Sequence, residues 1–556
     1  MQASEIPAGT ISVPAPRADT LEPTFVVPYR QYAYRDAAPT NGGYSLGPMN
    51  VGFRLSSANK DIVRERRAAL VNAREADRNS TAIRSGITKR AIDMVGKNLR
   101  LQSMPNFEAL GLTEDWAAEF ANQWENEFSL WGDDPRKLND ASRHNNFGSQ
   151  MFEVCRNTYG ADGEAALIIR YDERRQDMYR AHMATFVEVI NPVRISNREG
   201  LRDGLDYCQG KVLDEWGAYT ALDIEVEDPS AVAHRLRWER VMRETEWGRP
   251  IGVHWFPRYL AGAQRAMPAI LGMLRGNRML DTFDDKLLEQ AVKAAFMSIY
   301  IKTDATSAEA LAKLQPAPSG ATDPFLAAMN ARFGLYDELN VEGQSLPVLA
   351  PGDDIAVADA KNTTPDTDSF RFAFERKFAN HLGLGYARYS NDYSKTSFAS
   401  IRAEFIDAWR MTYADRYDFC QSVPAQIALA HLEECIVRNK IILPPNAPPF
   451  YENMTAYAQC EFRGPGMGWV DPVKDVKGAN LRIAGGLSSP QAEAAAQGSD
   501  YYDNIAATAR AQKYAKEKLG HEIDYASDGA AVEELPEPDE EALDAAAAAA
   551  AANQPE

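Results

Sequence analysis

Apolar residues recur every three or four positions in two neighbouring segments of the chain. In the first segment charged residues fill the intervening positions, and the stripe is Phe370, Phe374, Phe378 and Leu382. In the second segment the stripe is Phe398, Ile401, Phe405 and Trp409. This spacing places the side chains of each segment on one face of a helix. The pattern predicts two amphipathic helices, the first ending near Gly383 and Gly385 because glycine commonly ends helices.

The stretch between these helices, residues 386–397, is polar, rich in tyrosine and free of proline. We expect a loop that the two helices present to a partner. Its tyrosines could stack against a polymer, and its few cations supply isolated positive charge. The candidate contact residues are Tyr386, Arg388, Tyr389, Asn391, Tyr393 and Lys395. The residues leave one alternative open, an ordinary surface loop whose tyrosines pack on the next helix.

Further elements are predicted on both sides of this region. Helical spacing marks residues 59–92, 112–132, 266–297 and 425–437. Short apolar runs predict strands at 165–169, 186–190, 205–222 and 298–302, and a turn-flanked pair predicts a hairpin within 346–357. The mixture predicts an α+β fold. Two long helices bracket a small β-containing insert, which indicates a stalk with a tip.

The two ends of the chain differ in composition from its body. Residues 1–58 are rich in Pro, Ala, Thr and Gly, and they are expected to form an extended arm. Aromatic residues in that arm could pack along a neighbouring subunit, or the arm could be a solvated leader. Residues 521–556 contain eleven Asp and Glu and no Lys or Arg, so we expect a disordered acidic tail.

Charge and composition narrow the class of protein. The net charge is −19, and removing the tail leaves −19 + 11 = −8 for the body. Tight binders of duplex DNA carry a basic excess, which this chain lacks. Five widely spaced cysteines without a CxxC pair predict reduced, buried thiols. No apolar run is long enough to span a membrane, and no export signal is recognised.

Motifs of known catalytic centres are missing from the sequence. It contains no P-loop, no HExxH and no Gly-x-Ser-x-Gly. His431 and Cys435 are four apart and could share a helical face, but no second ligand pair accompanies them. We expect no catalytic residue, metal or cofactor, and a structural or assembly role. A hydrolase with an unrecognised metal or carboxylate site is the alternative.

Short motifs occur in a fixed order along residues 60–520. They include Arg66-Arg67-Ala68, Val95-Gly96-Lys97-Asn98-Leu99, Asp162-Gly163-Glu164, Trp216-Gly217-Ala218-Tyr219, Gly262-Ala263-Gln264-Arg265, Pro351-Gly352-Asp353 and Trp469-Val470-Asp471-Pro472. In this order they resemble the lambda-type family of tailed-phage portal proteins. Two departures, at Arg265-Ala266 and at Phe398-Ala399-Ser400, touch no catalytic group.

The resemblance implies a ring of identical subunits, typically dodecameric, at one vertex of the virion capsid, assembled in the host cytoplasm. Double-stranded DNA would pass through its channel without sequence specificity. The implied protein partners are the terminase large subunit, the major capsid protein and head-completion or adaptor proteins. Another ring component of the virion connector is the alternative. A mildly acidic conduit makes physical sense, because every fixed cation bound to a phosphate adds affinity that translocation must break.

The resemblance also suggests names for the segments. The projected parts are an arm (1–58), a wing (59–265), a first stem helix (266–297), a clip (298–366), a second stem helix (367–385), a tunnel loop (386–397), a wing helix (398–417), a crown (418–520) and an acidic tail (521–556). The clip would meet terminase and later the head-completion proteins, and the tunnel loop would face DNA.

Overall fold

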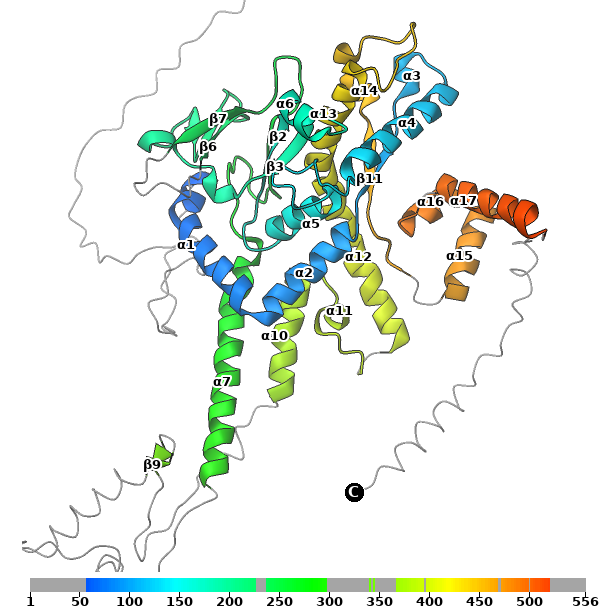
Figure 1. Cartoon of the computed structure of the whole chain (residues 1–556). Helices are drawn as coiled ribbons and strands as arrows, with labels where there is room; N and C mark the ends of the chain where they lie inside the picture. Colours follow the sequence, from blue (N-terminus) through cyan, green and yellow to red (C-terminus); the bar gives the residue numbers. More distant parts are fainter. Residues whose placement is uncertain are drawn as a thin grey trace, which may run out of the picture.

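A computed structural model of the chain shows a body with two helices extending from it (Figure 1). The structure describes residues 57–226, 237–297, 340–341, 344–345, 367–394, 397–468, 472–499 and 501–520. Within these ranges the protein is a mostly helical α+β structure with small antiparallel sheets. The α+β class is therefore confirmed.

The helical stretch predicted at 59–92 is two helices, α1 (Ala58–Asn79) and α2 (Thr81–Val95). Ser80 separates them, and its side chain accepts a hydrogen bond from the Ile83 N–H at the start of α2. The same hydroxyl donates to Asn277 of α7 (Leu274–Met297) at 2.9 Å. Ser80 is thus both the N-cap of α2 and the point where the α1–α2 corner meets α7.

The main core forms around α4 (Glu114–Gly132), α5 (Phe147–Thr158) and α13 (Pro424–Val437). Thr113 caps α4, which lies within the helix predicted at 112–132. Trp124 and Trp131 are buried, and Phe128 packs edge to face on Phe147 with ring centroids 5.0 Å apart. The same core includes residues from 419 to 462.

Two antiparallel sheets pack beside this core. One has the order β3–β2–β8, with β2 (Ala165–Tyr171) between β3 (Thr185–Val189) and β8 (Gly252–Trp255). The other has the order β4–β5–β6–β7 and comprises β4 (Tyr207–Cys208), β5 (Lys211–Leu213), β6 (Tyr219–Glu225) and β7 (Trp238–Met242). A small cluster, which includes Ile168, Leu222 and Val241, joins the sheets. The strands predicted at 165–169, 186–190 and 205–222 are confirmed.

The extending helices are α7 (Leu274–Met297), preceded by a 3₁₀ turn at 269–273, and α10 (Thr367–His381). After α10 come α11 (Tyr386–Ser390) and the long α12 (Phe398–Ser422). The strand predicted at 298–302 and the hairpin predicted within 346–357 lie outside the described residues. A short pair, β9 (Asn340–Val341) with β10 (Gln344–Ser345), lies nearby in sequence.

The remaining elements complete the body and its far side. They are α3 (Phe107–Leu110), α6 (Glu173–Tyr179), α14 (Met454–Tyr457), α15 (Pro472–Ala484), α16 (Pro490–Ala496) and α17 (Tyr501–Tyr514). Strand β1 (Arg100–Ser103) pairs with β11 (Cys460–Arg463), joining the early and late parts of the chain. A tyrosine hydroxyl of α12, from Tyr413, donates to the Ala496 carbonyl at 3.2 Å and ties the α15–α17 group to the body.

The projected boundary between wing helix and crown at residue 418 does not coincide with a structural boundary. It falls inside α12, and the next helix, α13, lies in the main core with α4 and α5. The physical reason is the apolar face of α13, with Ile427 and Leu432 fully buried. Between residues 418 and 520, the described residues after Arg463 contribute no side chain to this core.

Candidate functional site

The candidate site is the predicted loop 386–397 together with the elements that hold it. The first of these elements is α10, which packs against α7. The predicted phenylalanine stripe lies at this interface: Phe370 is 4.9 Å from Phe283 of α7 between ring centroids, and it stacks in turn with Phe374. Gly276 of α7 allows the close approach, because a Cβ there would lie 3.0 Å from the ring of Phe378. An ion pair between Arg371 and Asp284 at 2.7 Å adds a contact at the surface. These contacts explain the stripe as helix-pair packing.

The chain turns sharply after α10. Gly383 has φ +66, a left-handed conformation that favours glycine. Beside it lies the buried Arg90 of α2, which donates to Thr412 of α12 at 2.6 Å and forms an ion pair with Asp415. The turn is therefore enclosed by α2 and α12.

The predicted loop 386–397 begins with a helical turn, α11, rather than with irregular chain. The Ala387 N–H donates to Glu404 of α12 at 3.2 Å, and Asn391 ends the turn with φ 58. Local capping stabilises this turn in a segment whose composition suggested a loop. The part that continues as irregular chain begins at Asn391.

Tyr389 is buried, so its ring is not available for stacking on a polymer in this structure. Only 7% of the residue is exposed, and its ring packs over α2 at Gly86. A Cβ at Gly86 would lie 2.8 Å from the Tyr389 ring, so a glycine is needed there. Burial also raises the pKa of the Tyr389 phenol. Tyr389 thus packs on a helix, as the alternative had it, but on α2 and not on the next helix along the chain.

Tyr386 and Arg388 are half-buried at the edges of the turn. The Tyr386 ring meets Phe372 of α10 edge to face, with centroids 6.1 Å apart. Arg388 forms an ion pair with Asp93 of α2 at 2.8 Å. Both side chains hold α11 to its neighbours.

Lys89 of α2 holds the C-terminal end of α11. Its ammonium donates to the carbonyls of Arg388 and Tyr389, at 3.0 and 2.7 Å, and to the side chain of Asn391 at 3.1 Å. A cation at this end complements the partial negative charge of the last carbonyls. Burial and the neighbouring Arg388 lower the pKa of Lys89. Lys89 thus holds the end of α11, and the exposed part of the segment begins directly after it. We call this contact the Lys89 clamp.

Removing this clamp is expected to loosen the segment without unfolding the body. In a Lys89→Met variant, amide hydrogen exchange across residues 388–394 should rise about fivefold, equivalent to roughly 1 kcal/mol of local stability. The exposed Lys97, changed to Met, serves as the matched control and should leave this exchange unchanged. Equal exchange in wild type and Lys89→Met would show that the clamp contributes nothing.

The exposed part of the segment comprises Asn391 to Ser394. Tyr393 is 46% exposed, and Ser394 is held by Asp392, whose carboxylate accepts from the Ser394 N–H at 3.0 Å. Lys395 lies outside the described residues. Of the six candidate residues, Asn391 and Tyr393 are the two that the structure places on the surface.

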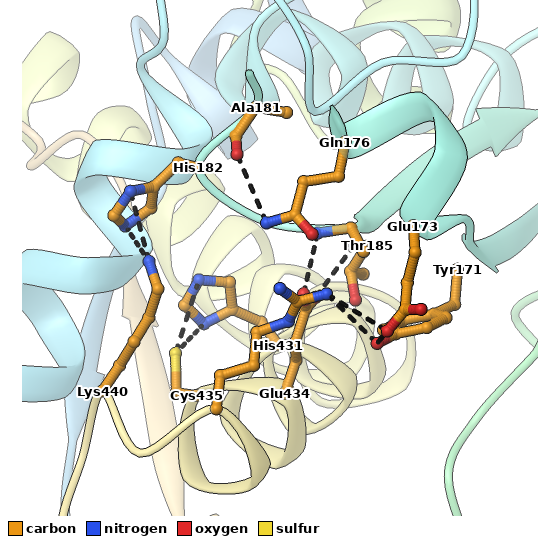
Figure 2. A network of polar contacts seen from close by, with 12 residues as sticks. Tyr171, Glu173, Gln176, Ala181, His182, Thr185, His431, Glu434, Cys435 and Lys440 are labelled. Carbon is orange, nitrogen blue, oxygen red and sulfur yellow. Dashed lines mark hydrogen bonds and ion pairs between the residues drawn. The ribbon is translucent and has the colours of Figure 1, made fainter. Parts of the chain in front are cut away.

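The candidate metal ligands on α13 have packing and hydrogen-bonding partners instead. The His431 ring lies within a buried aromatic group, edge to face with Phe128 at 5.2 Å, and Cys435 Sγ is 3.6 Å from its Nδ1. Glu434 accepts from the main-chain N–H groups of Ala184 and Thr185 (Figure 2). Across the described ranges no three potential metal-ligating side chains cluster.

Sequence reasoning missed a buried ionic cluster near the start of α7. The carboxylate of Glu164, at the start of β2, meets Arg66 of α1 at 2.9 Å, Arg265 at 2.8 Å and His254 of β8 at 3.3 Å, and it accepts from the Ala266 N–H at 2.6 Å. Arg66, Glu164 and Arg265 belong to separate motifs along 200 residues of the sequence. Only the fold brings them together.

The charges in this ionic cluster shift one another's ionisation. Burial alone raises the pKa of Glu164, but Arg265 and Arg66 outweigh it and hold the pKa well below its usual range. Burial lowers the pKa of His254 to about 3, so its imidazole is neutral near pH 7. Burial and Arg265 lower the pKa of the neighbouring Lys211 to about 7. The cluster joins α1, β2 and β8 to the segment that leads into α7.

Lys211 is expected to make the stability of the folded protein rise with pH. Its folded pKa lies below that of the unfolded chain, so between about pH 7 and pH 10.5 the unfolded chain binds the extra proton and stability rises with pH. We expect the melting temperature of wild type, relative to a Lys211→Met variant, to increase from pH 7 to pH 9.5. A difference that stays constant over this range would contradict the lowered pKa.

Comparison with known proteins identifies the family. Residues 50–416 match the family model described as phage portal protein, lambda family. That match spans about two thirds of the chain.

The chain belongs to the lambda family of phage portal proteins.

Two curated portal proteins extend the similarity almost to the whole chain. The portal protein of Escherichia phage N15 is 26% identical over 498 residues, which cover 88% of this chain and 92% of the relative. Portal protein B of Escherichia phage lambda is 26% identical over 499 residues, with the same two coverages. The resemblance found in the sequence motifs is confirmed.

Membership of the portal family decides the class of function. This portal protein is a structural virion component that forms the channel for DNA packaging and ejection at the capsid vertex, and it is not an enzyme. The hydrolase alternative is therefore wrong. None of the described helices is long and apolar enough to cross a bilayer.

Proposed function

We propose that copies of this portal protein form a dodecameric ring in which α7 and α10 are the stem, and the segment after α11 lines the DNA channel. The proposed partners are the terminase large subunit, the major capsid protein and head-completion proteins. Residues 298–366, which lie almost wholly outside the described ranges, would meet terminase and later the head-completion proteins.

One observation carries the channel assignment. A short turn, α11, is clamped to α2 and α12 by Lys89 and Glu404, and the chain that follows it is exposed. A short exposed segment on a firmly held helical turn suits contacts with DNA that must form and break repeatedly as the DNA moves. Tyr393 is the exposed aromatic of that segment.

The charges of the exposed segment favour weak contact with DNA. Arg388, its nearest preceding cation, is already paired with Asp93 at 2.8 Å, so little free positive charge is fixed at the base. Fewer fixed cations mean less salt-dependent affinity for phosphates and a smaller barrier to sliding. Ring symmetry repeats each weak contact around the channel axis.

The test combines Tyr393→Ala with Lys395→Ala in the full chain. Rings should form at the wild-type level, and packaged or retained DNA should fall about tenfold because base stacking at Tyr393 and the Lys395 charge are lost. Tyr417 of α12, 60% exposed, provides the control Tyr417→Ala. Normal packaging by the double variant would show that this segment does not contact DNA.

A further inference from the structure

Helix α1 has one outward face that is almost wholly basic. The exposed positions along its 22 residues are Lys60, Arg64, Arg67, Val71, Arg78 and Asn79, and the first five recur at helical spacing. Successive positions three, four or seven apart lie on one side of a helix. The acidic residue on the flank of this face is Glu75, which lies 3.7 Å from Arg278.

The cations of this face have no acidic partner within the described subunit, although Arg78 donates to the Arg74 carbonyl of the same helix at 3.3 Å. Among the residues that the structure describes, no ion pair joins Lys60, Arg64, Arg67 or Arg78 to an acidic group. Their inward neighbours behave differently, since Arg66 pairs with Glu164 and Arg74 with Asp162. The outward row is therefore a concentration of unneutralised positive charge on a protein whose net charge is −19.

The acidic tail has the composition that would complement this face. Seven of its eleven carboxylates fall within the twelve residues 533–544. Pro536 and Pro538 disfavour a helix there and favour an extended backbone. Twelve extended residues span about 40 Å, while the 22-residue α1 is about 33 Å long. The acidic run is therefore long enough to cover the basic face and is complementary to it in charge.

We propose that residues 533–544 of one copy bind the basic face of α1 on the adjacent copy of the ring. Figure 1 shows α1 on one side of the body and α17, from which the tail departs, on the opposite side. In a ring of head-to-tail copies, opposite sides of adjacent copies face each other. This placement favours contact between copies over contact within one copy. The inference rests on the proposed ring.

Charge complementarity of this kind adds specificity and speeds encounter more than it adds affinity. The tail would act as a strap between neighbouring subunits that forms readily and weakens with salt. Leu535 lies within the acidic run, and the 62%-exposed Val71 lies within the basic face. These two apolar positions mark where a cross-link should form.

The experiment uses the full-length chain carrying Val71→Cys and Leu535→Cys. The five native cysteines are buried, so oxidation should act mainly on the introduced pair. Assembled rings, verified by electron microscopy, are oxidised at low salt and separated without reductant. A ladder of multimers is expected. The control pair Leu130→Cys with Leu535→Cys, on the 61%-exposed Leu130 of α4, should give no ladder.

Charge reversal provides the second arm. Adding Arg64→Glu and Arg67→Glu to the cysteine pair should reduce the ladder about tenfold, because attraction becomes repulsion. The matched reversal Arg174→Glu with Arg410→Glu, also at exposed positions, should leave the ladder intact.

The outcomes separate this inference from the proposed function. Intact rings with no cross-link, or with links only inside single chains, would overturn the strap while leaving the ring proposal in place. If reversal on α1 changes DNA retention but not the ladder, the face binds DNA and the strap is wrong. Failure of the wild-type chain to form rings would instead count against the proposed function, and with it against the strap.

Discussion

Changing Glu164 to Gln is expected to lower the free energy of unfolding by about 3–5 kcal/mol, the largest single effect in the described structure. The substitution keeps the shape of the side chain but removes its negative charge. Arg66 and Arg265 would then face each other in a site where the side chains are 9% exposed or less. Two buried cations without their shared carboxylate are strongly unfavourable.

The large expected loss of stability follows from the number of elements that the Glu164 carboxylate connects. Glu164 contacts α1, β8 and the main chain at Ala266, which leads into the stem. Thermal or denaturant unfolding of the purified variant measures the loss. Because the folded pKa of Glu164 lies well below its usual range, this contribution should be present in full above about pH 4.5 and should be lost progressively as the pH falls from there toward the lowered pKa.

A half-exposed ion pair gives the matched control. Glu188 pairs with Arg170 at 2.7 Å, with both side chains about one quarter to one third exposed. Glu188→Gln should cost less than about 1 kcal/mol, since water screens such pairs. Similar losses for Glu164→Gln and Glu188→Gln would mean that burial does not strengthen the cluster.

Tyr389→Ala is expected to destabilise the junction of α11 with α2 by about 3 kcal/mol, because it empties a site built for an aromatic ring. Gly86 on α2 leaves the space for that ring, and Leu382 packs beside it. The variant should lose ring assembly together with DNA packaging. Measured unfolding and ring formation report these two effects.

Two related variants define what the Tyr389 ring does. Within the described structure the buried Tyr389 hydroxyl has no hydrogen-bond partner, so Tyr389→Phe should change stability by less than about 1 kcal/mol. Tyr393→Ala should leave folding unchanged, because that side chain is 46% exposed. If the Tyr389→Ala variant folds and assembles as well as the Tyr393→Ala variant, the aromatic ring of Tyr389 is not a structural anchor.

Much of the fold could be read from local patterns. The stripe from Phe370 to Phe378 requires a partner helix, and the apolar run 165–169 requires a buried strand, because each side chain must leave water. Both elements are present as predicted. The α1–α2 break at Ser80 was missed because the hydrophobic spacing continues across it. Amphipathic spacing does not tell which core a helix joins, so the place of α13 in the main core could not be read from the pattern.

The sequence by itself determined the helical stripes, the strands at 165–169, 186–190 and within 205–222, and the family, because these depend on local spacing and on motif order. Only the tertiary structure decided that Tyr389 is an anchor while Tyr393, four residues later, is exposed. The difference arises from Gly86, about 300 positions away in the sequence, which leaves space on α2 for the aromatic ring of Tyr389. The Glu164 cluster has the same origin, since its charges meet only when α1, β2 and β8 pack together.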